Sequence, residues 1–243
     1  MKKIVPDLSI VIPCFNETKN VTLVLEEFQK IIEQSQYFIE IIIIDGGSTD
    51  DTPKELQESF KHLSPDNFKL ILNKERGGYG ADITQALSKA KGKVLSWTHA
   101  DMQTDPADVI KALDLYKNSK EDKLIIKGKR KNRKLSEAFF TFGMQVAVFA
   151  LLKTYLDDIN AQPKLFSKEF YNKYIKNKAP SDFSLDLYLL YQAKINGYNI
   201  MEIPVHFKDR IYGEAKGGGS VKTKIKLIIR TFKYIFKTRR DIQ

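Results

Sequence analysis

The stretch IEIIIIDGGSTDDT, residues 39–52, decides the fold class. Its isoleucine run has the length of one strand, and the lack of polar alternation fits a strand buried on both faces. Glycines and acids follow the run, and residues 52–60 then have the composition of a helix. A strand, a turn and a helix in this order form the repeating unit of an α/β protein.

The same unit recurs on both sides of this stretch. LSIVIPCF, from Leu8, predicts a strand, and apolar residues at helical spacing predict a helix over Val21 to Ile32. FKLILN and GKVLSWTHAD predict two more strands, separated by a helix over Ala81 to Ala90. We therefore expect an α/β fold, with a mostly parallel, Rossmann-like sheet, right-handed crossovers and flanking helices.

Composition narrows the class of function. Of the 243 residues, 42% are hydrophobic, which is enough for a substantial core. The single cysteine, Cys14, excludes an internal disulfide framework and favours a reducing compartment. The formal net charge of +10 indicates a polyanionic partner, but no RNP-type, zinc or helix-turn-helix pattern accompanies it, so we expect no nucleic acid. Pro6 and Asp7 interrupt the first apolar run, which is therefore a poor signal peptide.

Polar residues collect where the predicted strands end. They occupy residues 13–17, 45–50, 73–80 and 99–105, and ligands of open parallel sheets bind at this edge. Asp101 and Gln103 supply oxygen ligands for Mg²⁺ or Mn²⁺, since a carboxylate beside bound phosphates needs an intervening cation. The loop NKERGGYGADI offers Arg76 to a phosphate and lets backbone at Gly77 approach a ligand closely. Walker and GxGxxG patterns are absent from the sequence, which disfavours P-loop and nicotinamide chemistry.

Four ordered motifs carry a resemblance to a known family. LSIVIPCFNETKNV, IIIIDGGSTDDT, NKERGGYGADITQAL and GKVLSWTHADMQTDP resemble the family-2 inverting glycosyltransferases with a GT-A fold. The likeness is greatest to dolichyl-phosphate mannose synthase and the bacterial polyprenyl-phosphate glycosyltransferases. It spans about residues 7 to 216 and implies transfer of a sugar from a UDP- or GDP-sugar to a lipid-linked acceptor.

The resemblance assigns the donor side. It implies that Pro13, Asn16 and Glu17 line the nucleoside pocket, that Asp45 reads the base, and that Ser48 belongs to the same turn. Arg76 and Gly77 are placed beside the donor in the same way.

Within the four motifs, two positions depart from the family pattern. Asp101 and Gln103 match the metal motif DADxQ, but His99 replaces its first acid, and Gly46 replaces the second acid of DDGSTD. His99 then has three alternatives: a nitrogen ligand of the metal, a hydrogen-bond donor to phosphate, or a mark of weakened metal dependence.

The second half of the chain predicts the acceptor side and a membrane contact. The basic run KGKRKNRKLS precedes EAFFTFGMQVAVFALL, an apolar segment too short to span a bilayer, which is either a buried core helix or an interfacial helix. The resemblance gives Arg130 a phosphate-binding role. Gln162 and Lys164, in the acceptor-side turn QPKLF, contact sugar or phosphate or only form a turn set by Pro163.

Residues 183–216 resemble the closing segment of the subgroup. We expect a helix from Phe183 to Ala193, a strand through Ile203 to Phe207, and cations Arg210 and Lys216 acting on the donor diphosphate or acceptor phosphate. A sugar hydroxyl acceptor would need a carboxylate base, for which Asp186 and Asp182 are the candidates. A polyprenyl phosphate is already ionised and needs none.

The tail predicts a helix that lies on an anionic membrane, packs against a partner helix, or docks on the domain. We expect one GT-A domain over 1–216, with a nucleotide-sugar half to about 110 and an acceptor half over 111–216, then a glycine hinge and a basic amphipathic helix over 217–243. The main hypothesis is a peripheral glycosyltransferase at the cytoplasmic face of the membrane. The alternatives are transfer to a glycan hydroxyl with Asp186 or Asp182 as base, and a nucleotide-binding member without turnover. A homo-oligomer and a separate membrane partner both stay open.

Overall fold

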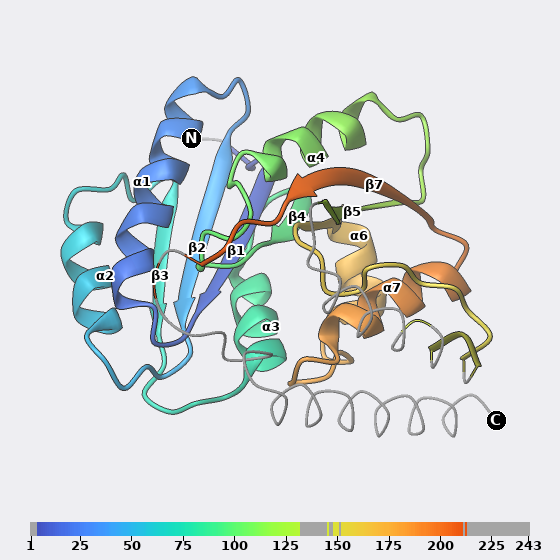
Figure 1. Cartoon of the computed structure of the whole chain (residues 1–243). Helices are drawn as coiled ribbons and strands as arrows, with labels where there is room; N and C mark the ends of the chain where they lie inside the picture. Colours follow the sequence, from blue (N-terminus) through green and yellow to red (C-terminus); the bar gives the residue numbers. More distant parts are fainter. Residues whose placement is uncertain (1–3, 132–144, 146–147, 151, 211, 213–243) are drawn as a thin grey trace.

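The computed structural model describes residues 4–131, 145, 148–150, 152–210 and 212. Its described strands form one seven-stranded sheet in the order β3-β2-β1-β4-β6-β5-β7. Figure 1 shows the sheet between two helical layers. The predicted α/β architecture is confirmed.

The first half follows the predicted pattern closely. Its strands are β1 (Leu8–Cys14), β2 (Ile39–Asp45), β3 (Phe68–Leu72) and β4 (Val94–Trp97). β1 pairs in parallel with β2 and β4, and β2 pairs in parallel with β3. The connecting helices are α1 (Thr18–Gln34), α2 (Thr52–Phe60) and α3 (Tyr79–Lys89). All four strands therefore end at one edge of the sheet.

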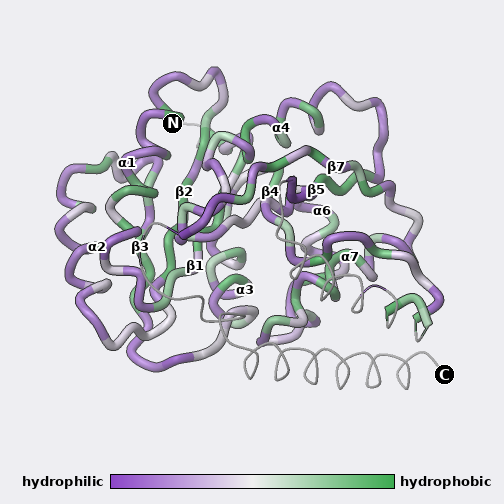
Figure 2. Tube along the Cα trace, in the orientation of Figure 1, coloured by the Kyte–Doolittle hydropathy of each residue, from purple (hydrophilic) through white to green (hydrophobic). Residues whose placement is uncertain are grey.

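The isoleucine run of β2 fills both faces of the sheet. Ile41 and Ile43 join one core cluster with side chains of α1, whereas Ile42 and Ile44 join a second cluster with side chains of α3 and α7. All seven residues of β2 are buried. Figure 2 shows the hydrophobic colour concentrated along the strands of this half. Burial of apolar surface on two faces, at about 25 cal/mol per Å², explains why this strand carries no polar alternation.

The second half completes the sheet. It contains α4 (Asp108–Asn118), β5 (Leu124–Lys131), β6 (Lys164–Ser167), α6 (Lys168–Phe170), a π-helical turn (Tyr171–Ile175), α7 (Leu185–Ile195) and β7 (Asn199–His206). β6 runs antiparallel to both β4 and β5, and β5 pairs in parallel with β7. β6 is thus the one described strand that opposes the others.

Two strands were not expected from the sequence. β5 begins with three apolar residues and continues into the basic run, where Lys127 forms an ion pair of 2.9 Å with Glu202 of β7. β6 begins at Lys164, directly after a cis Gln162–Pro163 peptide bond, where the sequence predicted a turn alone. In both places cross-strand partners, rather than local pattern, determine the strand.

The two helices predicted to meet a membrane lie mainly or wholly outside the described residues. The segment 137–152 is described only at 145, 148–150 and 152, and the tail 217–243 is not described. Among the residues that the structure describes, no helix combines the length and apolarity needed to cross a bilayer.

Gly128 of β5 provides a test of this packing. Its N–H donates to the Pro163 carbonyl at 2.9 Å, and a Cβ atom added at Gly128 would lie 2.0 Å from the Gln162 carbonyl oxygen. We expect Gly128→Ala to lower the free energy of unfolding by about 1–3 kcal/mol, because the backbone of the cis-proline loop must move. Urea denaturation followed by circular dichroism measures this loss.

Gly197→Asn is the matched control. Gly197 has a φ of +73°, which asparagine tolerates, and an added Cβ there meets nothing within 4 Å. A Gly128→Ala variant as stable as this control would contradict the close approach.

Candidate active site

The loops after β1 and β2 are joined by side-chain hydrogen bonds. The Asn16 N–H donates to Ser48 Oγ at 2.8 Å, and the Asn16 Oδ1 accepts from the Thr49 N–H at 2.8 Å. Asp45 is fully buried, and its Oδ2 accepts from the N–H groups of Gly47 and Ser48 at 3.2 and 3.0 Å, while the Ser48 hydroxyl donates to Oδ1. The turn that follows β2 therefore holds the Asp45 carboxylate in place.

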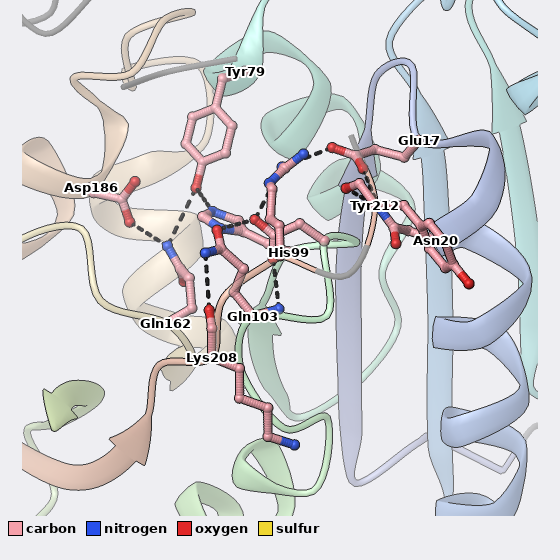
Figure 3. Close-up of polar contacts among 11 residues, drawn as sticks. Glu17, Asn20, Tyr79, His99, Gln103, Gln162, Asp186, Lys208 and Tyr212 are labelled. Atoms are coloured by element: carbon pink, nitrogen blue, oxygen red, sulfur yellow. Dashed lines mark hydrogen bonds and ion pairs between the residues drawn. The ribbon is translucent and has the colours of Figure 1, made fainter. Parts of the chain in front are cut away.

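Arg210 joins two carboxylates from distant parts of the chain. One guanidinium nitrogen lies 2.9 Å from Glu17 Oε1 and 3.2 Å from Asp101 Oδ2. Asn20 donates to Glu17 Oε2 at 2.6 Å and to the Tyr212 carbonyl at 3.3 Å. The segment after β7 consequently reaches across the ends of β4 and β1. Figure 3 shows Glu17, Asn20 and Tyr212 together at this edge.

His99 lies between Asp101 and a tyrosine of α3. Its Nδ1 is 4.0 Å from Asp101 Oδ2, and its Nε2 is 3.0 Å from the Tyr79 hydroxyl. Gln103 donates from its backbone to Asp101 Oδ1 at 3.1 Å and from its side chain to the Lys208 carbonyl at 3.1 Å. Sequence reasoning missed Tyr79, although its position inside the loop GGYG was a usable signal.

A buried polar network continues from Tyr79 towards α7. Gln162 Nε2 lies 3.4 Å from the Tyr79 hydroxyl and donates to Asp186 Oδ1 at 2.9 Å. Lys164 Nζ is 3.1 Å from the same Asp186 oxygen, and the side chains of Lys164 and Asp186 are 0% and 4% exposed. Burial lowers the pKa of Lys164 and raises that of Tyr79. Figure 3 shows this network beside the one around Glu17, with His99 and Gln103 between them.

The two base candidates differ in their surroundings. Asp186 is buried in the ion pair with Lys164 at the first turn of α7. Asp182 precedes the helix, and its Oδ1 accepts from the Ser184 N–H at 2.9 Å.

The other predicted side chains that the structure describes lie at the same edge of the sheet. Arg130, at the end of β5, forms an ion pair with Asp158, with its Nε 3.0 Å from Oδ1. The Arg76 guanidinium stacks 4.1 Å above the Phe15 ring. Pro13 pairs in register with Ile44. Lys216 lies outside the described residues.

A second carboxylate that sequence reasoning missed lies beside the β2 turn. Asp82 Oδ2 is 2.4 Å from the position that a Cβ atom on Gly46 would take. Burial raises the pKa of Asp82 from 3.8 to about 6; the charge of Asp45 adds to the shift, and Asn73 and Arg76 oppose it. The glycine at position 46 is thus explained by the carboxylate at position 82.

The arrangement is suited to an anionic ligand held with a cation. Glu17 and Asp101 already bind one cation, Arg210, and His99 stands 4.0 Å from the Asp101 carboxylate. Within the described ranges, no three His, Cys, Asp or Glu side chains form a group that could hold a metal ion by themselves. A divalent ion at Asp101 would therefore need oxygens from its ligand as well.

Comparison with known proteins settles the family. The sequence model of the family described as Glycosyl transferase family 2 matches residues 9–179. The chain belongs to glycosyl transferase family 2. The resemblance carried by the four motifs is confirmed, and the protein is a glycosyltransferase enzyme of this family.

Curated relatives within the family act on polyprenyl phosphates. The chain is 24% identical to "Dolichyl-phosphate beta-glucosyltransferase" of Dictyostelium discoideum over 83% of its own length and 66% of the relative's. It is 29% identical to "Undecaprenyl-phosphate 4-deoxy-4-formamido-L-arabinose transferase" of Proteus mirabilis over 52% of its own length and 37% of the relative's. The chain thus spans about two thirds of the first relative and little over a third of the second.

Solved glycosyltransferases share the fold. Glucosyl-3-phosphoglycerate synthase of Mycobacterium tuberculosis, in complex with Mn²⁺, UDP and glucosyl-3-phosphoglycerate, has a TM-score of 0.70 at 15% identity, covering 96% of this chain and 80% of that one. The mannosyltransferase PcManGT of Pyrobaculum calidifontis, in complex with GDP-Man and Mn²⁺, has a TM-score of 0.67 at 18% identity, covering 97% and 65%. The fold of this family-2 chain is GT-A.

Proposed function

We propose that this family-2 enzyme moves a sugar from a nucleoside diphosphate sugar to a polyprenyl phosphate, with inversion at the anomeric carbon. The observation that carries the choice of acceptor is the burial of Asp186 in an ion pair with Lys164 at 3.1 Å. A carboxylate held in this way is a poor general base, whereas a phosphate acceptor is already ionised and needs no base. The activities named for the two curated relatives support the same choice.

The nucleoside of the donor occupies the carboxyl edge of β1, β2 and β3 in this proposal. Pro13, Asn16, Glu17, Asp45, Ser48, Arg76 and Gly77 surround the nucleoside, which is a uridine or a guanosine. These residues come from the last residues of β1 and β2 and from the loops after β1, β2 and β3, and the loops after β1 and β2 are tied by Asn16 and Ser48 at 2.8 Å. Ligands of open α/β sheets bind at such an edge.

A divalent cation, Mg²⁺ or Mn²⁺, fits the donor set at Asp101. The Asp101 carboxylate already holds a guanidinium at 3.2 Å, and the imidazole of His99 is 4.0 Å away, so oxygen and nitrogen ligands are both at hand. Asp101, His99 and Gln103 would hold the ion together with oxygens of the diphosphate. The ion would supply positive charge for the leaving diphosphate.

Cationic side chains of the protein act on the same charge. We place Arg210 and Lys216 on the donor diphosphate, where a guanidinium stabilises the negative charge that develops as the glycosidic bond breaks. Arg130 binds the acceptor phosphate once it leaves Asp158, which it now contacts at 3.0 Å. Gln162 and Lys164 fix Asp186 and Tyr79 on the acceptor side.

The acceptor places the enzyme at a membrane. We propose peripheral attachment at the cytoplasmic face through the basic segments after residues 127 and 217, with one GT-A domain over 1–216. A homo-oligomer and a membrane partner protein are both compatible with this attachment.

A lipid-extraction assay tests the function. Radiolabelled UDP- and GDP-sugars are offered with undecaprenyl phosphate in detergent, in the presence of Mg²⁺, Mn²⁺ or EDTA. We expect label in the organic phase with one donor and a divalent ion. If the protein binds nucleotide but the label stays in the aqueous phase with every donor, a hydroxyl acceptor replaces the phosphate acceptor, with Asp186 or Asp182 as base.

A further inference from the structure

The carboxylate of Asp82 lies beside Gly46, in the turn that follows β2. A Cβ atom on Gly46 would meet Asp82 Oδ2 at 2.4 Å and Asp82 Cγ at 3.1 Å. Asp82 belongs to the first turn of α3, and its side chain reaches back to the end of β2. The space that a side chain at position 46 would fill therefore holds an acid that comes from another element.

The Asp82 carboxylate is fixed by a hydrogen bond, but no ion pair with a described residue compensates its charge. Its Oδ1 accepts from Asn73 Nδ2 at 3.2 Å, and Asn73 is itself fixed by reciprocal hydrogen bonds of 3.0 Å with Gln85. No described cation forms an ion pair with Asp82, although the residue is only 6% exposed. Burying an ionisable acid without an ion-pair partner is costly, so such a residue is a candidate for function.

Asp45, the acid that the sequence suggested as the base reader, has other partners. Three donors of its own turn contact its two oxygens. Asp82 has one such hydrogen bond, on Oδ1, which leaves Oδ2 as an acceptor at the edge of the sheet. The charged and titratable groups that face Asp82 from neighbouring elements are Asp45 of β2, Arg76 of the loop before α3 and Cys14 of β1.

We infer that Asp82 determines which nucleobase the enzyme accepts, by taking a hydrogen bond from the imino N–H of a keto base. Uracil, thymine and guanine carry that N–H, whereas cytosine and adenine present a lone pair at the corresponding ring nitrogen. A carboxylate attracts the first class and repels the second. This inference rests on the proposed function, because it assumes a nucleotide donor at this edge of the sheet.

Calorimetric titration of the intact protein with nucleotides tests it. UDP, GDP, CDP and ADP are titrated with Mg²⁺ at pH 7.5 into the wild type, Asp82→Ala, Asp82→Asn and the control Asp66→Ala, which changes an exposed acid before β3. We expect UDP or GDP to bind the wild type, and both Asp82 variants to bind it about tenfold or more weakly. Asp66→Ala should bind like the wild type. A folded Asp82 variant with wild-type affinity would overturn the inference.

Two further readouts separate base recognition from structure. Gly46→Ala should weaken binding in the wild type and be tolerated beside Asp82→Ala, because the contact at 2.4 Å is then gone. Binding to the wild type should weaken more steeply than binding to Asp82→Asn as the pH falls below about 6, since the accepting form of Asp82 is the ionised one and only the titration of the nucleotide's terminal phosphate is common to both. A pH profile shared by both proteins would argue against Asp82.

The two proposals fail in different ways. A wild type that binds none of the four nucleotides refutes the nucleotide donor, and this inference with it. If the wild type and the Asp82 variants bind UDP or GDP with the same affinity, only this inference is refuted.

Discussion

Replacing Asp101 with alanine should lower sugar transfer by about 10³-fold and leave the fold intact, since one electrostatic group at the reacting charge contributes this much. Asp101 contacts Arg210 at 3.2 Å and fixes the Gln103 backbone at 3.1 Å. Both contacts lie in loops, and Arg210 keeps Glu17 as a partner at 2.9 Å, so little stability depends on the carboxylate. Initial rates at saturating donor, with a thermal melt of the same preparation, measure both effects.

Asp101→Asn and Asp105→Asn complete the experiment. The first keeps the shape of the side chain and removes its charge, so it should be nearly as inactive as the alanine variant. The second changes a neighbouring exposed acid and should transfer sugar normally. Turnover of Asp101→Ala within a few-fold of the wild type would remove Asp101 from the cation site.

Replacing Lys164 with methionine should lower the free energy of unfolding by about 3–5 kcal/mol, because it leaves Asp186 charged and buried without its partner. The two side chains are 0% and 4% exposed, which excludes water as a substitute. Lys164 also donates to the Ala161 carbonyl at 2.5 Å, and that hydrogen bond is lost as well. Urea denaturation followed by tryptophan fluorescence reports the change, since Trp97 is fully buried.

The double variant Lys164→Met/Asp186→Asn is the matched control. It removes both charges and keeps an amide oxygen for Gln162, which now donates to Asp186 at 2.9 Å. Replacing a whole buried pair is far less costly than breaking it, so the double variant should recover much of the lost stability. A single variant that loses less than about 1 kcal/mol would show that the pair is solvated, as exposed pairs are.

How far the sequence predicted the fold depends on what each strand packs against. β1 and β2 were predicted because strands buried by helices on both faces need continuous apolar runs, and their residues show it. β5 and β6 were missed because their pairing depends on neighbours distant in sequence. The clearest case is Lys127 of β5, whose side chain is 3% exposed and forms an ion pair with Glu202 of β7, 75 positions further along the chain.

The sequence predicted which loops form the candidate site, but not which side chains contact one another in it. Motif positions placed Glu17, Asp101 and Arg210 at one edge, but no spacing rule shows that a single guanidinium contacts both acids. Tyr79 and Asp82 were missed for a related reason. The two residues lie three positions apart on one helical turn of α3. Tyr79 contacts His99, which follows β4, and Asp82 lies against Gly46, which follows β2. Those partners exist only in the folded chain.

The reversed strand β6 determines how the two halves of the molecule depend on each other. It hydrogen-bonds β4 of the first half along one side and β5 of the second along the other. A fragment ending near residue 110 would leave β4 as a bare edge and would remove Phe166, whose ring now lies 5.4 Å from that of Trp97. Such an edge recruits other chains. The first half therefore has the strand and helix order of a complete α/β module, yet we expect it to aggregate when it is expressed without the strand that closes it.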